Sequence, residues 1–352
     1  MRRLFIMLLI GSVLLGLCGC SSWFSEAYVS ITPHQGQSTQ DALGQLSASS
    51  YPELYDTLVT LIRSGERKGM IVLSDLDEEV CQSYLEVAIK NVLMLDPVGA
   101  YAVEHIDFEL GSNASRLAAA VQIDYLRSKS DILRIKTAAD MNEARQMIGQ
   151  ALEQVQSSLV LRIQSYEQVD FIQLVQHFAD ENPSVVMQTP QVMVAVYPQS
   201  GKDRLVELSF TYQTQREELL YMQKLVKPVF TAAELSVQGN SSQREKYMQL
   251  YSFLMERFDY EYASNATPAY SLLQKGTGDC KAFACVYAEM CRQAGLECSM
   301  VTGMRNGQSW VWNRIVINNS TYYVDLIASN EAGSMRILTA AELEGYVWNE
   351  DG

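Results

Sequence analysis

The most restrictive feature of this 352-residue sequence is an order of helix and strand signals that occurs twice before residue 237. Each occurrence opens with a short apolar run and continues with apolar residues at helical spacing, and a Pro-containing step then ends the helix. Two runs typical of strands follow each proline. In sequence order, the first set is 70–73, Val80–Val92, Asp96-Pro97, 101–110 and 116–127, and the second is 159–161, Phe171–Phe178, Asn182-Pro183, 192–197 and 204–212.

These landmarks recur at a nearly constant distance. Pro97 and Pro183 lie 86 residues apart, and Tyr125 and Tyr212 lie 87 apart. A constant period of this kind indicates two copies of one helix-plus-hairpin unit, although short α+β segments also look alike by chance. We therefore predict an α+β fold with unit 1 at 51–136 and unit 2, including a linker helix, at 137–237. Neither unit carries a nucleophile motif, a Gly-rich phosphate loop or a metal spacing, so spacer, adaptor and ligand-binding roles stay open.

The N-terminus predicts export. Arg2 and Arg3 precede an uncharged run from Leu4 to Leu17, which is too short to span a membrane unless it recruits its flanks. The run ends in Leu-Cys-Gly-Cys-Ser-Ser, which resembles the bacterial lipoprotein signal, in which a lipidated Cys becomes the new N-terminus. The resemblance implies a signal peptide at 1–19 and lipidation of Cys20. The alternative is an ordinary secretory signal that is cleaved elsewhere.

Charge limits the partners. The sequence has 27 Lys and Arg against 41 Asp and Glu, a formal charge of −14 that falls to −16 if cleavage removes Arg2 and Arg3. A chain this acidic repels phosphate backbones, so we expect no nucleic-acid partner. A lipid rather than charge would hold the protein to an anionic membrane, on its extracytoplasmic face. Residues 20–50 are rich in Ser, Gln, Gly and Thr and predict a tether, or else a loop folded onto the body.

A new region begins after the loop at 238–242, and its chemistry centres on Cys280. Apolar spacing predicts a helix over Arg244–Phe258, and a second helix starts just after Gly276-Thr277-Gly278-Asp279 with Cys280 at its N-terminus. Backbone N–H groups and the helix dipole stabilise a thiolate at such a position, and the same groups can hold an oxyanion. Asp279 opposes the thiolate, although it can also cap the helix.

Residues 241–328 resemble the transglutaminase-like superfamily, whose fold is related to papain-like cysteine peptidases. The segments that carry the resemblance are AYSLLQKGTGDCKAFA, CRQAGLECSMVTG, SWVWNRIVI and TYYVDLI, in the family order. The resemblance implies a transglutaminase-like domain at 238–352, with Cys280 at the nucleophile position and Asp325 at the position that orients a catalytic His. The position of that His falls on Trp310, in Trp310-Val311-Trp312-Asn313.

This departure removes the usual base. An indole carries only a donor N–H and cannot accept the thiol proton, and no His occurs after His177. The other histidines are His34 and His105, so a His from the repeat units could serve only through an unusual docking of the units. An unassisted Cys280 thiolate is a further alternative. We expect the fold without its ordinary acyl-transfer chemistry.

The remaining thiols suggest structure rather than catalysis. Cys81 and Cys285 sit in apolar helical patterns typical of core residues, while Cys291 and Cys298 flank a turn that a disulfide could cross. No Cys and His spacing matches a zinc site, and we predict neither a metal nor a cofactor.

Three functions compete. The favoured one is a membrane-anchored lipoprotein whose degenerate domain binds a peptide or peptidoglycan ligand, with Trp310 and Trp312 lining the old groove. The second is an active cysteine peptidase or acyltransferase that uses Cys280 with an unorthodox base. The third is a structural spacer that presents a surface to a partner.

Overall fold

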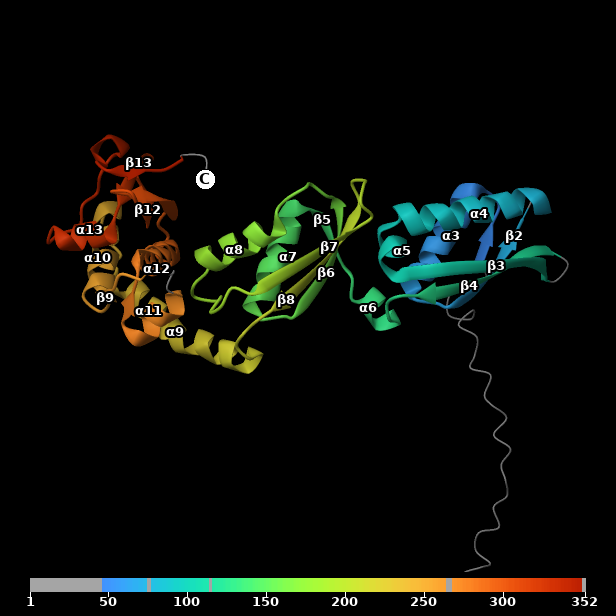
Figure 1. The fold of residues 1–352 in the computed structure, drawn as a ribbon, viewed down its shortest axis with the longest axis horizontal. Coiled ribbons are helices and arrows are strands. Elements are labelled where there is room, and N and C mark those ends of the chain that lie inside the picture. Colours follow the sequence, from blue (N-terminus) through green and yellow to red (C-terminus); the bar gives the residue numbers. More distant parts are fainter. Residues whose placement is uncertain (1–45, 75–76, 114–115, 264–267, 350–352) are drawn as a thin grey trace, which may run out of the picture.

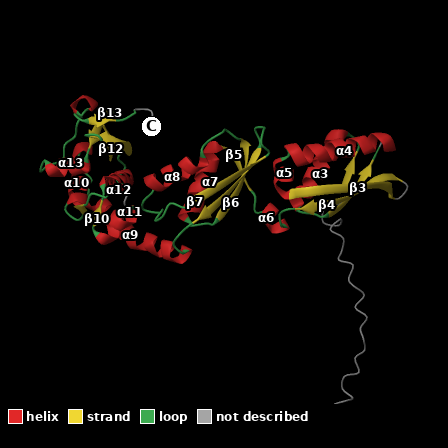
Figure 2. Ribbon diagram, viewed as in Figure 1, coloured by secondary structure: helices red, strands yellow, loops and turns green. Residues whose placement is uncertain are grey.

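The computed structural model describes residues 46–74, 77–113, 116–263 and 268–349 of the chain. Three α+β units follow one another along it, as Figure 1 shows from blue to red. In each unit, helices pack beside a four-stranded sheet (Figure 2). The mixed α+β class that the sequence predicts is confirmed. Cys20, His34 and the signal peptide lie outside the described residues.

Unit 1 is a four-stranded sheet with α3 and α4 on one side and the short helix α5 at the end next to unit 2 (Figure 1). Strand β1 pairs in parallel with β2, while β4 pairs antiparallel with both β2 and β3. The elements are β1 (Leu46–Ala48), α3 (Tyr51–Ser64), β2 (Lys68–Leu73), α4 (Glu78–Leu95), α5 (Pro97–Ala102), β3 (Val103–Asn113) and β4 (Arg116–Tyr125). Strand β1 lies in the segment that we assigned to the tether, so the last residues of that segment belong to the folded unit.

Unit 2 has the same strand pattern. Its sheet runs β5-β6-β8-β7, with β5 and β6 parallel and the other pairs antiparallel, as in β1-β2-β4-β3. After the short linking helix α6 (Lys129–Leu133), its elements are β5 (Lys136–Asp140), α7 (Met141–Glu153), β6 (Ser158–Ser165), α8 (Phe171–Glu181), β7 (Gln191–Tyr197) and β8 (Arg204–Thr211). The boundary that we drew after residue 136 falls inside β5. Duplication of one ancestral unit stays a prediction.

Each unit begins one strand and one helix earlier than the repeat predicted from the sequence, because β1 and β5 lie before the apolar runs that we used as landmarks.

The Asp96-Pro97 step ends one helix and also begins another. Helix α4 ends there as predicted, but the Asp96 side chain accepts hydrogen bonds from the Val98 and Gly99 amides and so starts a new helix, α5. Proline is favoured in the first turn of a helix because the missing N–H is not needed there.

The third unit packs helices against an antiparallel sheet with the order β13-β12-β11-β14. The helices are α9 (Arg216–Ser236), α10 (Gln243–Met255), α11 (Ala269–Lys275), α12 (Cys280–Gln293), α13 (Leu326–Glu331) and a short 3-10 turn at Ala340–Glu342. The strands are β9 (Asp259–Tyr260), β10 (Thr277–Gly278), β11 (Cys298–Arg305), β12 (Gln308–Ile317), β13 (Ser320–Val324) and β14 (Tyr346–Val347). Val226 and Phe230 of α9 belong to this core, so the expected linker helix is part of the C-terminal unit.

Polar contacts join the three units. Arg127 of unit 1 pairs with Glu207 of unit 2 at 2.7 Å. Lys281 of α12 pairs with Asp180 of α8 at 2.9 Å, which fixes the end of unit 2 against the helix that carries Cys280.

Candidate functional site

A turn with strict backbone requirements places Cys280 at the first position of α12. Gly276 ends α11 with a positive φ of 84°, which a glycine adopts without strain. Gly278 then passes so close to α11 and α12 that an added Cβ would lie 3.0 Å from Leu272 and 3.1 Å from Ala282. Asp279 caps the helix by accepting a hydrogen bond from the Ala282 amide at 2.9 Å. The sequence therefore builds the expected nucleophile position.

The surroundings of the Cys280 thiol disfavour its ionised form. The pKa of Cys280 is raised, chiefly because the thiol is buried away from water, and the charges of Asp279 and Asp325 add to this. Backbone hydrogen bonds from Val311 and Lys281 act in the opposite direction without reversing the result. The favourable helix terminus is thus outweighed, and the thiol stays protonated at neutral pH.

Asp325 lies at the end of β13 and is 5% exposed. Its Oδ1 accepts hydrogen bonds from the amides of Ile327 at 3.0 Å and Ala328 at 2.9 Å, which makes it the N-cap of α13. Its Oδ2 accepts the Trp310 Nε1–H at 2.7 Å and the Tyr346 hydroxyl at 2.6 Å. An ionised carboxylate offers about four acceptor positions. Four donors already use them.

Trp310 makes the contact to Asp325 that the resemblance assigns to a His. Its ring is 7% exposed and lies 6.0 Å from the Tyr260 ring, and the Arg305 guanidinium stands over it at 5.1 Å from the ring centre. The indole reproduces the donor side of an imidazole but has no nitrogen that can accept a proton. The arrangement therefore keeps the hydrogen bond to Asp325 and lacks a proton acceptor for Cys280.

Trp312 is in the core, which corrects our expectation that it lines a groove. Its side chain is 1% exposed, with Tyr346 and Trp348 packed edge-on at 5.1 and 5.6 Å between ring centres. Strand β14 contributes to this burial because it pairs with β11 at the edge of the sheet and so brings the Tyr346 and Trp348 rings onto Trp312. The approach is so close that a Cβ on Gly303 would lie 2.4 Å from the Val347 carbonyl oxygen. In this structure Trp312 offers no surface to a ligand.

Sequence reasoning missed Tyr346 and Arg305. Arg305 lies 3.7 Å from Asp325 and 3.0 Å from Glu331, and Tyr346 reaches Asp325 from a strand 21 residues away. Burial and the bond to Asp325 raise the pKa of Tyr346, so its hydroxyl stays a donor. Neither residue belongs to a local motif, and only the pairing of β14 with β11 brings Tyr346 to the site.

The remaining histidines and thiols are placed as follows. His105 lies on β3 of unit 1 and contacts Asp107 at 2.9 Å, and His177 is exposed on α8. Cys81, Cys285 and Cys291 are buried, and burial raises the pKa of Cys285 to about 12. Cys291 and Cys298 are free thiols in this structure, so no disulfide crosses the turn here.

The described residues outside the Cys280 region were compared with the patterns of metal sites, membrane-spanning helices and surface pockets. Among them, no group of three or more His, Cys, Asp or Glu side chains is placed to hold a metal, and the expectation of no metal stays a prediction. No helix in the described part of the chain is long and apolar enough to cross a membrane.

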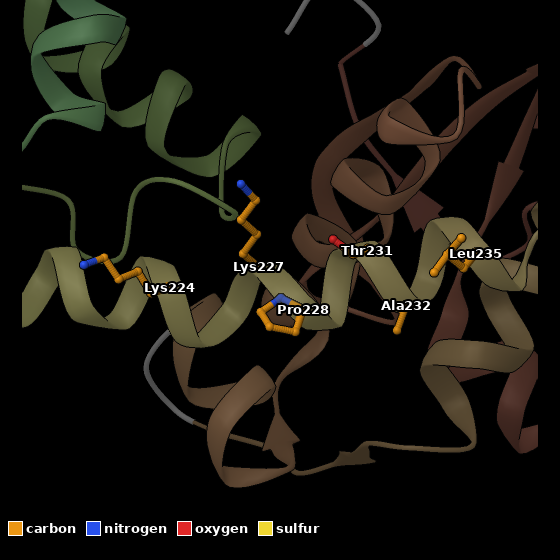
Figure 3. Close-up of a pocket in the computed structure, with 6 residues that line it drawn as sticks. All are labelled: Lys224, Lys227, Pro228, Thr231, Ala232 and Leu235. Atoms are coloured by element: carbon orange, nitrogen blue, oxygen red, sulfur yellow. The ribbon is translucent and has the colours of Figure 1, made fainter.

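A shallow, mostly apolar hollow lies on α9 (Figure 3). Its lining is Lys224, Lys227, Pro228, Thr231, Ala232 and Leu235.

A comparison with protein families finds a match in the C-terminal part of the chain. Residues 231–350 match the model of the transglutaminase-like superfamily. No curated protein matches the chain.

Three solved structures are similar to it at low levels. The one described as "Crystal structure of a TGase" is 11% identical with a TM-score of 0.28, over 55% of this chain and 58% of its own. A "putative cysteine protease" from Cytophaga hutchinsonii has 10% identity and a TM-score of 0.27, over 45% of this chain and 70% of its own. A "putative protease" from Parabacteroides distasonis ATCC 8503 has 9% identity and a TM-score of 0.25, over 73% of this chain and 39% of its own.

The chain thus spans 58% of the length of the first of these structures. The family match covers most of the C-terminal unit. Together with the helix-borne Cys280 and the sheet that holds Asp325, it identifies residues 231–350 as a transglutaminase-like domain.

Proposed function

We propose that the protein is a membrane-anchored lipoprotein whose transglutaminase-like domain binds a ligand and does not catalyse acyl transfer. The observation that carries the loss of catalysis is the hydrogen bonding of Asp325. All of its acceptor positions are used by backbone amides, Trp310 and Tyr346. Its role is therefore to hold β13, α13 and β14 together around Trp310, which takes the place of the base.

The state of Cys280 supports the same proposal. Acyl transfer by a cysteine needs a thiolate, which an adjacent base or a strongly lowered pKa supplies. Here burial raises the pKa of Cys280, and the neighbouring carboxylates oppose ionisation. If the protein is an active enzyme, its base has to come from a residue other than Trp310, Asp279 and Asp325.

We propose a peptide or peptidoglycan stem peptide as the ligand, bound on the surface beside Cys280. Tyr260 is half-buried against Trp310, and Tyr262, two residues on, is 65% exposed. An exposed tyrosine gives a flat apolar surface with a polar end, which suits a peptide or sugar-linked peptide. Trp310 and Trp312 are both buried, at 7% and 1% exposure, so these tyrosines replace the two tryptophans as the residues that we expect to contact the ligand.

The thiol experiment tests the loss of catalysis. The full chain is treated with iodoacetamide at pH 7, and the modified cysteines are located by mass spectrometry. We expect Cys280 to react no faster than an ordinary thiol, because its pKa is raised. Fast modification that Cys280→Ser removes would favour the active enzyme instead.

The ligand is tested separately. Pull-down on peptidoglycan and titration with synthetic stem peptides compare the natural chain with Tyr262→Ala. The matched control is Tyr221→Ala, which removes a tyrosine of similar exposure, 60%, from α9. We expect only the Tyr262 variant to lose binding, and equal binding by both variants would reject this surface.

Anchoring is tested by Cys20→Ser. If a lipid on Cys20 holds the protein, the variant leaves the membrane fraction for the soluble fraction. Unchanged retention would reject lipidation at this residue.

A further inference from the structure

The open edges of the two N-terminal sheets differ in a way that points to self-association. β3 ends the sheet of unit 1 and β7 ends the sheet of unit 2, at the same place in the same strand order. A terminal strand presents unpaired backbone N–H and C=O groups and is a template for another strand unless charges or bends protect it. The two edges therefore serve as each other's control.

Charged side chains protect β3. Glu104, Asp107 and Glu109 are exposed along it, together with His105. Exposed charges along an edge strand disfavour its pairing with a further strand, because pairing would remove them from water.

Strand β7 lacks this protection. Its sequence, Gln-Val-Met-Val-Ala-Val-Tyr, contains no charged residue and no proline, and Met193 and Val194 are 68% and 37% exposed. The Gln199 side chain donates to the Val196 carbonyl at 3.1 Å, which shows that the backbone of Val196 faces away from β8. Because backbone groups alternate between the two sides of a strand, Val194 and Val192 face the same open edge.

The strand is complementary to itself. In an antiparallel pair centred on Val194, Val192 lies opposite Val196, and Met193 lies opposite Ala195, a large side chain beside a small one. No like charges meet in this register. At its far end Tyr197 packs on Tyr101 of unit 1, with 5.6 Å between ring centres, so the pairing stretch is 192–196.

We propose that a second copy of this chain pairs antiparallel along β7, so that the two unit 2 sheets form one continuous sheet across a twofold axis. This contact is isologous, as most homodimer interfaces are. The chain carries a formal charge of −14, so two copies repel each other at a distance. Salt screens that repulsion and leaves the neutral β7 contact intact, and dimerisation should therefore strengthen as salt is raised.

The test follows the mass of the full chain in a mild detergent by light scattering, as concentration and salt are raised. We expect the mass to rise from one chain toward two. Met193→Lys should abolish the rise, because the two lysines would lie diagonally across the axis on one face. Val194→Pro should also abolish it by removing an N–H that faces the open edge.

The matched control is Leu235→Lys, which removes a residue that is 80% exposed from α9 and leaves β7 unchanged. It should dimerise like the natural chain. Three results would overturn the proposal: a chain that stays monomeric up to about 1 mM, dimerisation of Met193→Lys like the natural chain, or loss of the dimer in Leu235→Lys. Met193 is too exposed for its replacement to unfold unit 2, so the test stands even if Val194→Pro does not fold.

Discussion

Two helices of the C-terminal domain begin at an aspartate cap, α12 at Asp279 and α13 at Asp325, and the two ends differ in what surrounds the cap. At α12 the cap accepts a hydrogen bond from Ala282, and the Cys280 thiol beside it remains half-buried. At α13 the cap also accepts hydrogen bonds from Trp310 and from Tyr346, which belongs to the edge strand β14. Cys280 therefore follows a simple helix cap, whereas Asp325 links α13 to Trp310 and to Tyr346.

This difference shows why the identity of a residue at a family position is insufficient to assign its role. Asp325 stands where the resemblance expects an aspartate that orients a base. Its acceptor positions, however, are occupied by groups that hold three elements together. The partners of a buried carboxylate show which groups it orients, and here they are backbone amides, an indole and a phenol.

The largest expected effect comes from removing the two caps separately. Asp325→Ala leaves the buried donors of Trp310 and Tyr346 unpaired and also removes a helix cap, so we expect a loss of about 3 to 5 kcal/mol in unfolding free energy. Asp279→Ala removes a cap and should cost about 1 kcal/mol. Urea unfolding followed by tryptophan fluorescence reports on this domain, since three of the four tryptophans lie in it. Equal losses would contradict the structural role of Asp325.

The next largest effect is a gain in the reactivity of the Cys280 thiol when a histidine replaces Trp310. Trp310→His combined with Tyr346→Phe supplies an imidazole and frees one acceptor position on Asp325. We expect iodoacetamide to modify Cys280 about tenfold faster at pH 7, because a nearby imidazolium lowers a thiol pKa. Tyr346→Phe alone is the control and should leave the rate unchanged. No gain in the double variant would mean that position 310 does not face the thiol.

The pH dependence of the Cys280 alkylation rate tests the state of this thiol in the natural chain. Burial raises the pKa of Cys280, so its alkylation rate should increase about tenfold per pH unit from pH 7 to 9 without a plateau. A raised thiol pKa also means that the folded state holds its proton more tightly than the unfolded state. This contribution to stability is present below the unfolded pKa and is lost as pH rises through the folded pKa. A plateau near neutral pH would reveal an activated thiol.

The smallest effect concerns the charge beside the thiol. Asp279→Asn keeps an acceptor for the cap and removes a negative charge that raises the pKa of Cys280. We expect about a twofold increase in alkylation rate at pH 7 with little change in stability. Asp180→Asn, which removes the partner of Lys281 on α8, is a comparison at a more distant carboxylate. A decrease in rate after Asp279→Asn would contradict the assigned direction.

Local signals predicted the elements that carry the site, and long-range pairing decided the rest. Glycines and an aspartate before an amphipathic run correctly placed Cys280 at the start of α12. The predicted hairpins of both units were also close to the observed bounds. Strand β13 ends at Val324, because Asp325 caps α13 directly after it.

The burial of Trp312 and the contribution of Tyr346 could not be read from the sequence. Both depend on β14, a two-residue strand without hydrophobic periodicity, and on its pairing with β11 some 40 residues earlier. Strand β1 was missed for a similar reason: three residues at the end of a Ser-rich segment form a strand only because β2 pairs with them.

We propose that the domain does not transfer acyl groups, because Trp310 supplies no base and both it and Tyr346 donate hydrogen bonds to Asp325. The most direct measurement incubates the natural full chain with activated acyl donors and with peptide substrates, and follows both product release and acylation of Cys280 by mass spectrometry. We predict no turnover above the level of Cys280→Ala. Turnover that disappears in Cys280→Ala, while that variant keeps the unfolding midpoint of the natural chain, would contradict the claim.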